Sequence, residues 1–302
     1  MYIEQINTKK FNLLLYVPIP LAFLVVILFN YVSTKDVNIE ELMQIMIQNF
    51  GLNITFVALV APLSIACLAL LFWVKFVHQQ SIRSLTTSRE KVDWNRILFS
   101  FMVWSLITVF SVLLFYYMAP EDFVYNFKPL PFFTFLILAI ILLPLQTSFE
   151  EYLFRGYLMQ GIGVATKSRL IPLVVTSVLF GLMHIANPEV GKMGYIIMVY
   201  YIGTGFFLGI ITLMDEGLEL ALGFHAANNL IGALLVTADW TALQTHSIFK
   251  DISEPSAGID VLLPVVVIFP ILLVIFGKKY GWSNWKEKLT GTITAEPSEN
   301  LN

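Results

Sequence analysis

Long runs without a charged side chain recur along this 302-residue sequence and restrict the folds open to it. A helix that crosses a bilayer needs about 20 mainly apolar residues, because the hydrocarbon core is about 30 Å thick and a helix rises about 1.5 Å per residue. Runs of about this length occur at 11–33, 54–74, 97–120, 129–149, 170–188, 193–214, 220–238 and 261–277. The sequence therefore predicts an all-α, polytopic transmembrane bundle of about eight helices.

The composition agrees with a surface that faces lipid. Only 13% of the residues are charged and 57% are apolar, whereas about a quarter of the residues in a soluble domain are charged. Strands are not expected, since an open sheet would leave unpaired backbone groups in hydrocarbon. The net charge of −3 provides no basic surface for nucleic acid. The expected partner is therefore the lipid bilayer, and Cys67, the only cysteine, is expected to pack inside the protein.

The distribution of lysine and arginine predicts the orientation. With eight spans, four basic residues fall on one side: Lys35, Lys128, Lys192 and Lys250. The other 14 of the 18 fall on the side of both termini, which the positive-inside rule makes cytoplasmic. The turn Asp215–Glu219 is an acidic exception on that side.

Three parts are expected along the chain. Residues 1–125 hold N-terminal transmembrane helices and a basic cytoplasmic loop, 126–280 hold a catalytic membrane core, and 281–302 form a disordered cytoplasmic tail. Residues 37–50 have apolar side chains at helical spacing, which predicts an interfacial helix on the outer face.

A few polar side chains interrupt the apolar spans. Ionisable groups at membrane depth are costly and generally mark function. Those present are Glu150, Glu151 and Arg155 near the end of the fourth span, His184 in the fifth, and His225 with Asn229 in the seventh. Counting about 1.5 Å per residue puts these groups about 10–21 Å from the predicted cytoplasmic ends of three helices. Their similar depth predicts one buried site.

This set of groups suits hydrolysis of a peptide bond. A carboxylate can act as general base toward water, imidazoles can orient that water, and an amide can stabilise an oxyanion. Taken singly, each residue also has a structural interpretation, such as an ion pair between Glu151 and Arg155. Zinc is an alternative on ligand types, with Glu150, His184 and His225 as ligands. Because no HExxH-type pair is present, a metal-free mechanism is preferred. His78 and His246 lie in predicted loops and receive no role, and Asn228 is expected to face away from the site.

Three motifs carry a family resemblance. Glu150-Glu151-Tyr152-Leu153-Phe154-Arg155 resembles EExxxR, Phe180 to His184 resembles FxxxH, and His225 to Asn229 resembles HxxxN. Together they resemble the CPBP family, which comprises CAAX proteases and bacteriocin-processing or Abi membrane proteins. The resemblance covers roughly residues 130–240.

The resemblance implies an intramembrane endopeptidase of membrane-associated, prenylated or peptide substrates. It implies that Glu150 activates water, His184 holds it, and His225 with Asn229 forms the oxyanion site. Glu151, Arg155 and Phe180 would support this geometry. The family is often catalogued among metalloproteases, but its members are thought to use glutamate without a metal, so no cofactor is expected. We expect a bacterial inner membrane location.

Two other classes of function remain open. One is a non-proteolytic membrane scaffold or bacteriocin-immunity factor that keeps the motifs for structure. The other is a proton-coupled transporter, since intramembrane carboxylates also serve proton relays. The amide of Asn229 favours the hydrolase, because a proton relay needs titratable groups.

Overall fold

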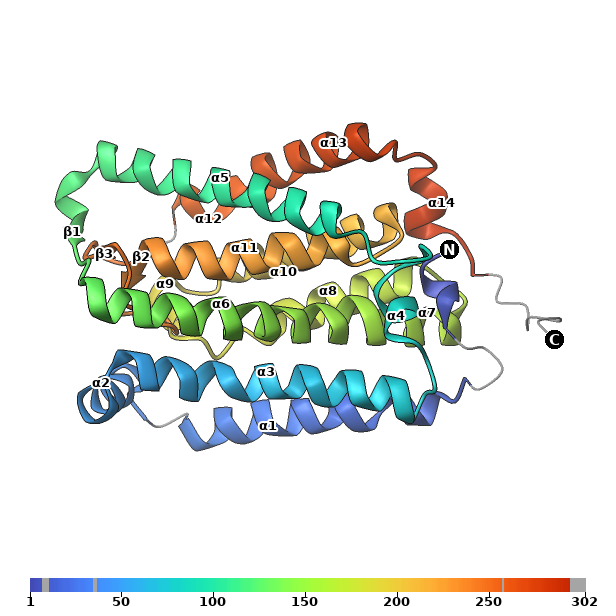
Figure 1. Ribbon diagram of the computed structural model, residues 1–302, viewed down its shortest axis with the longest axis horizontal. Coiled ribbons are helices and arrows are strands. Elements are labelled where there is room, and N and C mark those ends of the chain that lie inside the picture. The colour runs from blue at the N-terminus through green and yellow to red at the C-terminus, as the bar shows by residue number, and fades with distance from the viewer. Residues whose placement is uncertain (7–10, 35–36, 257, 294–302) are drawn as a thin grey trace.

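The computed structural model describes residues 1–6, 11–34, 37–256 and 258–293, and its long helices lie side by side along one axis (Figure 1). Six helices among these residues are long and apolar enough to cross a membrane. They are Leu13–Ser33, Leu52–Phe76, Trp94–Met118, Pro129–Thr166, Ile197–Asp215 and Val261–Tyr280. The chain is therefore an all-α polytopic bundle, as the uncharged runs predict.

Two expected spans are shorter helices. The run 170–188 forms α8 (Leu170–Leu182), which ends in a turn before Pro188. The run 220–238 forms α11 (Glu219–Leu235), which continues into the short strand β2 (Val236–Ala238). Six long helices and two shorter ones thus stand where eight full spans were expected.

Two of the spans contain a π-helix. The long segment Pro129–Thr166 consists of α6 (Pro129–Glu151), the π-helix η5 (Tyr152–Leu158) and α7 (Met159–Thr166). A second π-helix, η6 (Pro264–Ile268), separates α12 (Ile259–Leu263) from α13 (Phe269–Tyr280). The remaining long helices are α1 (Pro18–Thr34), α3 (Leu52–Phe76), α5 (Trp94–Met118) and α10 (Ile197–Asp215).

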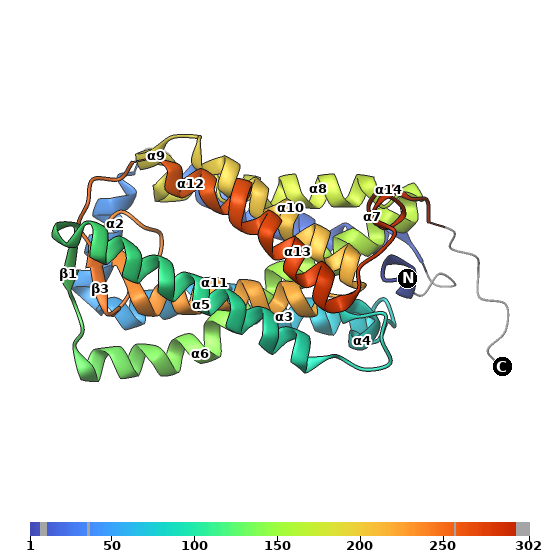
Figure 2. The same ribbon diagram turned by 90° about the horizontal axis from the view of Figure 1, so that it is seen from above.

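The two ends of the bundle differ. One, here called the sheet end, carries β1 (Phe123–Tyr125) antiparallel to β3 (Phe249–Asp251), which runs parallel to β2. Also at this end are α2 (Ile39–Phe50), the helix expected over 37–50, α9 (Pro188–Met193) and the short η4 (Pro120–Asp122) (Figures 1 and 2). The expectation of no strands was therefore wrong at this end, where the three short strands connect helices.

The opposite end, here called the terminal end, gathers the described parts of both termini (Figure 1). It carries η1 (Ile3–Gln5), η3 (Leu13–Tyr16), α4 (Ile82–Thr86) and α14 (Trp285–Thr290). The tail expected to be disordered from residue 281 thus includes a helix, and Ile293 beyond it is buried. Residues 294–302 lie outside the described residues.

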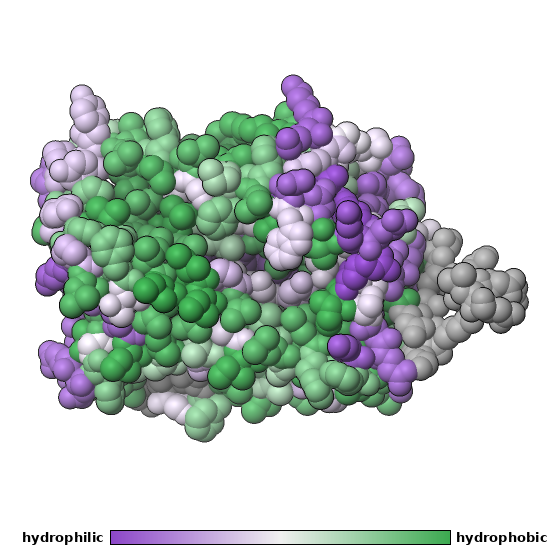
Figure 3. All heavy atoms as spheres, viewed as in Figure 1, coloured by the Kyte–Doolittle hydropathy of each residue, from purple (hydrophilic) through white to green (hydrophobic). Residues whose placement is uncertain are grey.

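Apolar side chains cover the middle of the face shown in Figure 3, and polar ones collect toward the two ends. Leu14, Phe29 and Leu130 each expose about three quarters of their surface. Such exposure is stable where the surroundings are lipid, and the protein is integral to a membrane.

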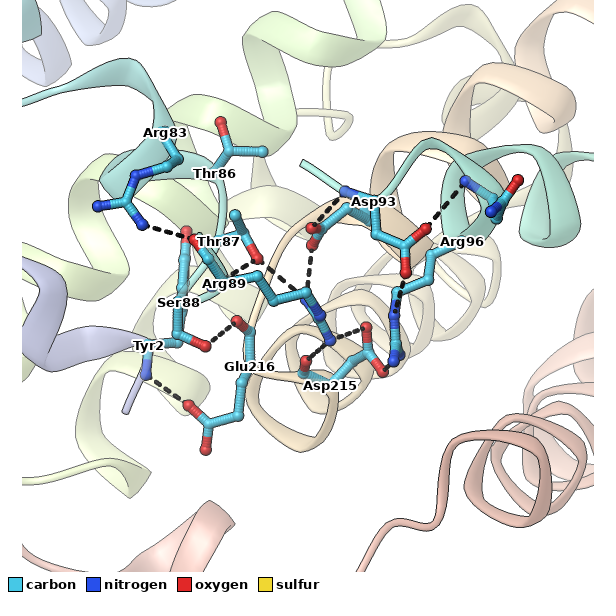
Figure 4. A network of polar contacts seen from close by, with 12 residues as sticks. Tyr2, Arg83, Thr86, Thr87, Ser88, Arg89, Asp93, Arg96, Asp215 and Glu216 are labelled. Carbon is cyan, nitrogen blue, oxygen red and sulfur yellow. Dashed lines mark hydrogen bonds and ion pairs between the residues drawn. The ribbon is translucent and has the colours of Figure 1, made fainter. Parts of the chain in front are cut away.

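The basic segment 78–96 folds onto the acidic turn after α10 (Figure 4). Arg89 pairs with Asp215 at 3.0 Å and with Glu219 at 3.1 Å, and Arg96 also pairs with Asp215. Asp215 and Glu219 are buried, so these arginines supply the opposite charge that buried carboxylates need. This pairing explains why an acidic turn lies among basic segments.

Close helix crossings position the interior. Helix α11 packs against both α5 and α6, and α8 packs against α10. A Cβ at Gly223 would lie 2.1 Å from the carbonyl oxygen of Ile97, and one at Gly205 would lie 2.4 Å from that of Ser177. Glycine at these two positions therefore allows backbones to approach within distances that no side chain permits.

Candidate active site

Two consecutive glutamates, Glu150 and Glu151, end α6 inside the protein, and both are buried. Neighbouring residues on a helix point about 100° apart, so the two carboxylates meet different partners. Glu150 accepts a hydrogen bond from Nε2 of Gln146 one turn earlier, and Glu151 pairs with Arg155 one turn later. The π-helix η5 begins directly after them, a distortion frequent at functional sites.

Arg155 is fully buried and joins three elements. Its Nη1 donates to Oε1 of Glu151 at 3.0 Å, and its Nη2 donates to the carbonyl oxygen of Gly205 on α10 at 3.1 Å. Its guanidinium carbon lies 4.2 Å from the centre of the Phe180 ring on α8. Since an unpaired buried charge is strongly unfavourable, Arg155 both balances Glu151 and fixes it relative to α8 and α10.

His225 on α11 lies between the two glutamates. Its Nδ1 is 2.7 Å from Oε1 of Glu151, and its Nε2 is 3.9 Å from Oε2 of Glu150. The carboxylate of Glu151 favours a proton on Nδ1, which fixes the tautomer and the direction of the ring. The remaining nitrogen, Nε2, therefore faces Glu150.

His184 was expected within a span, but it lies in the turn that follows α8. Its Nδ1 is 2.8 Å from the carbonyl oxygen of Phe180, and its ring stacks on Tyr201 at 4.4 Å between centroids. A carbonyl only accepts, so Nδ1 carries the proton and Nε2 of the neutral ring is free to accept a hydrogen bond. His184 is also within electrostatic range of Glu150 and His225.

Asn229 lies one turn beyond His225 and faces α6. Its Nδ2 donates to Oε1 of Gln146 at 3.0 Å, and its Oδ1 accepts from Nδ2 of Asn228 at 3.1 Å. Asn228 faces α5 and not α6, in agreement with the expectation that it points elsewhere, but its Nδ2 also reaches Asn229.

Two further residues of these polar contacts were not predicted. Gln146 is an amide in an apolar run, one turn before Glu150, and this spacing alone places it on the same helix face. Trp104 on α5 donates from Nε1 to Oδ1 of Asn228 at 3.0 Å. Nothing in its local sequence distinguishes Trp104 from other aromatic residues of the spans.

The alternative zinc ligands were Glu150, His184 and His225. Across the described part of the chain, no three His, Cys, Asp or Glu side chains come together as a group that could hold a metal ion. In both histidines Nδ1 is engaged, by Phe180 in one and by Glu151 in the other, which leaves Nε2 as the nitrogen open to a ligand. The expectation that no metal is required stays a prediction.

His78 and Cys67 are buried outside the site. His78 is buried, and its Nε2 lies 3.0 Å from the hydroxyl of Tyr157. Cys67 is buried as a free thiol among apolar neighbours.

Comparison with known proteins finds a family that is similar to the part of the chain holding these residues. Residues 128–231 match the family described as type II CAAX prenyl endopeptidase Rce1-like. This segment is Rce1-like. It contains all three motifs, so the resemblance to CAAX proteases is confirmed for the part of the chain that holds the site. Trp104 lies outside the Rce1-like segment.

One curated relative extends beyond this segment. The chain is 33% identical over 165 residues to the uncharacterized protein YyaK of Bacillus subtilis (strain 168). The alignment covers 54% of this chain and 55% of YyaK, so the chain spans about half the length of this relative. No solved structure matches the chain.

Proposed function

We propose that the protein is an intramembrane endopeptidase in which Glu150 activates a water molecule. The observation that carries the proposal is a buried carboxylate whose Oε2 faces an imidazole nitrogen at 3.9 Å, within an Rce1-like segment. Among the described residues, this Oε2 has no hydrogen-bond partner, so it is free to accept a proton from water.

The chemistry follows from these positions. Oε2 of Glu150 takes a proton from water, and the water oxygen attacks the carbonyl carbon of the scissile peptide. Nε2 of His184, as an acceptor, orients the second water proton. His225 and Asn229 stabilise the negative oxygen of the tetrahedral intermediate. The proton on Glu150 then passes to the leaving nitrogen as the carbon–nitrogen bond breaks.

Glu151 and Arg155 act on this chemistry through His225. The carboxylate of Glu151 holds Nδ1 of the ring and directs Nε2 toward the site, where a proton on Nε2 lets the ring donate to the oxyanion. The substrates proposed are peptide or membrane-protein segments, prenylated or not, that reach the site from the bilayer. The mechanism uses no metal ion.

The proposed location is a bacterial inner membrane with the terminal end in the cytoplasm. This orientation is supported by the 14 lysine and arginine residues that fall on the side of both termini, since basic residues are enriched on the cytoplasmic side. Substrates would then approach Glu150 from the cytoplasmic leaflet.

Cleavage by purified protein in lipid vesicles tests the proposal. The probe is an internally quenched peptide with a farnesylated C-terminal CAAX sequence, compared with the same peptide without the lipid. We expect Glu150→Gln to lower the rate at least about 100-fold, because the amide keeps the shape but cannot accept the proton. The matched control, Glu254→Gln, changes an exposed carboxylate and should retain full activity.

Two results would overturn the proposal. Full activity in folded Glu150→Gln would exclude a glutamate base at this position. Loss of activity on exhaustive chelation, restored by stoichiometric zinc, would replace the metal-free mechanism. Natural substrates can be identified in cells that carry either wild type or Glu150→Gln. Peptide N-termini found in the membranes of the first cells but not of the second mark the cleavage products.

A further inference from the structure

A chain of side-chain hydrogen bonds connects α5 to Glu150 through α11 and α6. It begins at Nε1 of Trp104, which donates to Oδ1 of Asn228 at 3.0 Å. Nδ2 of Asn228 donates to Oδ1 of Asn229 at 3.1 Å, and Nδ2 of Asn229 donates to Oε1 of Gln146 at 3.0 Å. Nε2 of Gln146 completes the chain by donating to Oε1 of Glu150.

The two ends of the chain fix its direction. An indole N–H can only donate, and an ionised carboxylate can only accept. Trp104 therefore requires the oxygen of Asn228 to face it, and each later amide then presents its NH₂ group to the next acceptor. Turning any one amide over would place oxygen against oxygen or NH₂ against NH₂. The arrangement is consistent from donor to acceptor along its whole length.

This direction distinguishes the two oxygens of Glu150. Oε1 receives an N–H from Gln146, so a proton on Oε1 would point at another donor. Oε2 faces Nε2 of His225 at 3.9 Å and has no hydrogen-bond partner among the described residues. When Glu150 takes up a proton, the proton therefore belongs on Oε2.

The same direction fixes what Asn229 can offer. Its Oδ1 is occupied by Asn228, and one hydrogen of its NH₂ group is donated to Gln146. One N–H of Asn229 remains for the negative oxygen of the intermediate. If the Asn229 amide were inverted, its oxygen would face the negative oxygen of the intermediate and repel it.

We propose that Trp104, Asn228 and Gln146 are positioning residues that make Oε2 the proton-accepting oxygen of Glu150. None of the three contacts Oε2 of Glu150. Trp104 and Asn228 act through the next amide, and Gln146 acts through Oε1 of Glu150. The proposal rests on the proposed function, in which Glu150 is the base. Through Trp104, helix α5 also positions Glu150, although α5 lies outside the Rce1-like segment.

A packing role for Trp104 is the alternative. Its ring lies 4.3 Å from that of Phe224 and 5.9 Å from that of Phe269 between centroids. Trp104→Phe keeps an aromatic ring in this cluster and removes only the indole donor. The hydroxyl of Tyr200, 3.5 Å from the same oxygen of Asn228, can either donate or accept. Without Trp104 the direction of the chain is therefore no longer fixed.

The decisive measurement is the protonation of Glu150, followed by infrared spectroscopy on purified protein in lipid vesicles. The carbonyl band of the protonated carboxyl is assigned as the band that Glu150→Gln removes, and its intensity is recorded against pH. In Gln146→Met the midpoint should move to higher pH by about one to two units, because hydrogen bonds to charged groups are stronger than those between neutral groups. Trp104→Phe should move it in the same direction by a smaller amount, and Tyr200→Phe should leave it unchanged.

The cleavage assay with the farnesylated quenched peptide provides a second reading. The acidic limb of the pH–rate profile should shift to higher pH in Trp104→Phe and in Gln146→Met. The double variant should shift no further than Gln146→Met alone, because both act through one chain. Asn228→Leu has no donor for Asn229 and adds no charge near Glu150. It should shift the limb in the same direction, and it keeps the test valid if Trp104→Phe fails to fold.

The outcomes separate the two proposals. Unchanged infrared midpoints in folded Trp104→Phe and Asn228→Leu would overturn the positioning chain while leaving Glu150 as the base. A Glu150→Gln variant that cleaves normally would overturn the proposed function, whatever the infrared titration shows. Additive shifts in the double variant would show that Trp104 and Gln146 act separately, which also overturns the chain.

Discussion

Replacing Arg155 by methionine tests whether the buried ion pair stabilises the fold. Arg155 and Glu151 are both fully buried, with 3.0 Å between Nη1 and Oε1. Without the guanidinium, Glu151 keeps only His225 as a hydrogen-bond partner among the described residues. Breaking such a pair by removing one partner costs about 3–5 kcal/mol in the free energy of unfolding. At about 2–4 °C per kcal/mol for chains of this class, the melting temperature should fall by about 6–20 °C.

Thermal unfolding of the purified protein in detergent, followed by tryptophan fluorescence, measures this change. The matched control is Arg83→Met, which makes the same substitution at an exposed position. The double variant Glu151→Gln/Arg155→Met should be more stable than Arg155→Met, because it leaves no uncompensated charge. A fall of less than about 2 °C for Arg155→Met, or equal stability of the two variants, would refute the reasoning.

Three further predictions concern packing, pH and orientation. Gly205→Ala should lower the free energy of unfolding by about 1–3 kcal/mol, because its Cβ would lie 2.4 Å from a backbone oxygen. The control is Gly232→Ala, whose Cβ would have no atom within 4 Å and which should not destabilise the protein in the same melting assay. Burial lowers the pKa of His78, so on acidification the unfolded chain binds a proton at this histidine before the folded protein does. The free energy of unfolding should therefore fall as the pH drops below about 6.5. His78→Gln should weaken this dependence in melting curves recorded against pH. In a Cys67→Ser background, Ser256→Cys should react with an impermeant thiol reagent on intact cells, and Lys91→Cys only after the membrane is broken; the reverse pattern would invert the orientation.

The presence of one polar site could be predicted because it depends on distance along helices. The rise per residue is nearly constant, so the sequence separations of Glu150 and His225 from their helix ends place both at similar depth. The 3.9 Å between them agrees with that count. The spacing of Glu151 and Arg155 by one turn likewise predicts their ion pair, which is observed.

Helix ends were harder to predict than helix positions. The run 170–188 has no charge before its end, so hydropathy alone extends it as far as Pro188. The helix stops at Leu182, and His184 lies in the turn beyond it. That turn places Nδ1 against the carbonyl of Phe180 and the ring against Tyr201, contacts that span lengths do not specify.

The role of Asn228 could not be predicted because it depends on which helices flank α11. Neighbouring residues on a helix point about 100° apart, so Asn229, which faces α6, implies that Asn228 faces another direction. That direction is occupied by α5, since α11 packs against both helices. Gly223, against the backbone of Ile97, brings α5 close enough for the indole of Trp104 to reach Asn228. One helix therefore presents His225 and Asn229 to the carboxylates on α6 and, on its adjacent face, Asn228 to α5. A site that the motifs confine to three helices thereby depends on a fourth.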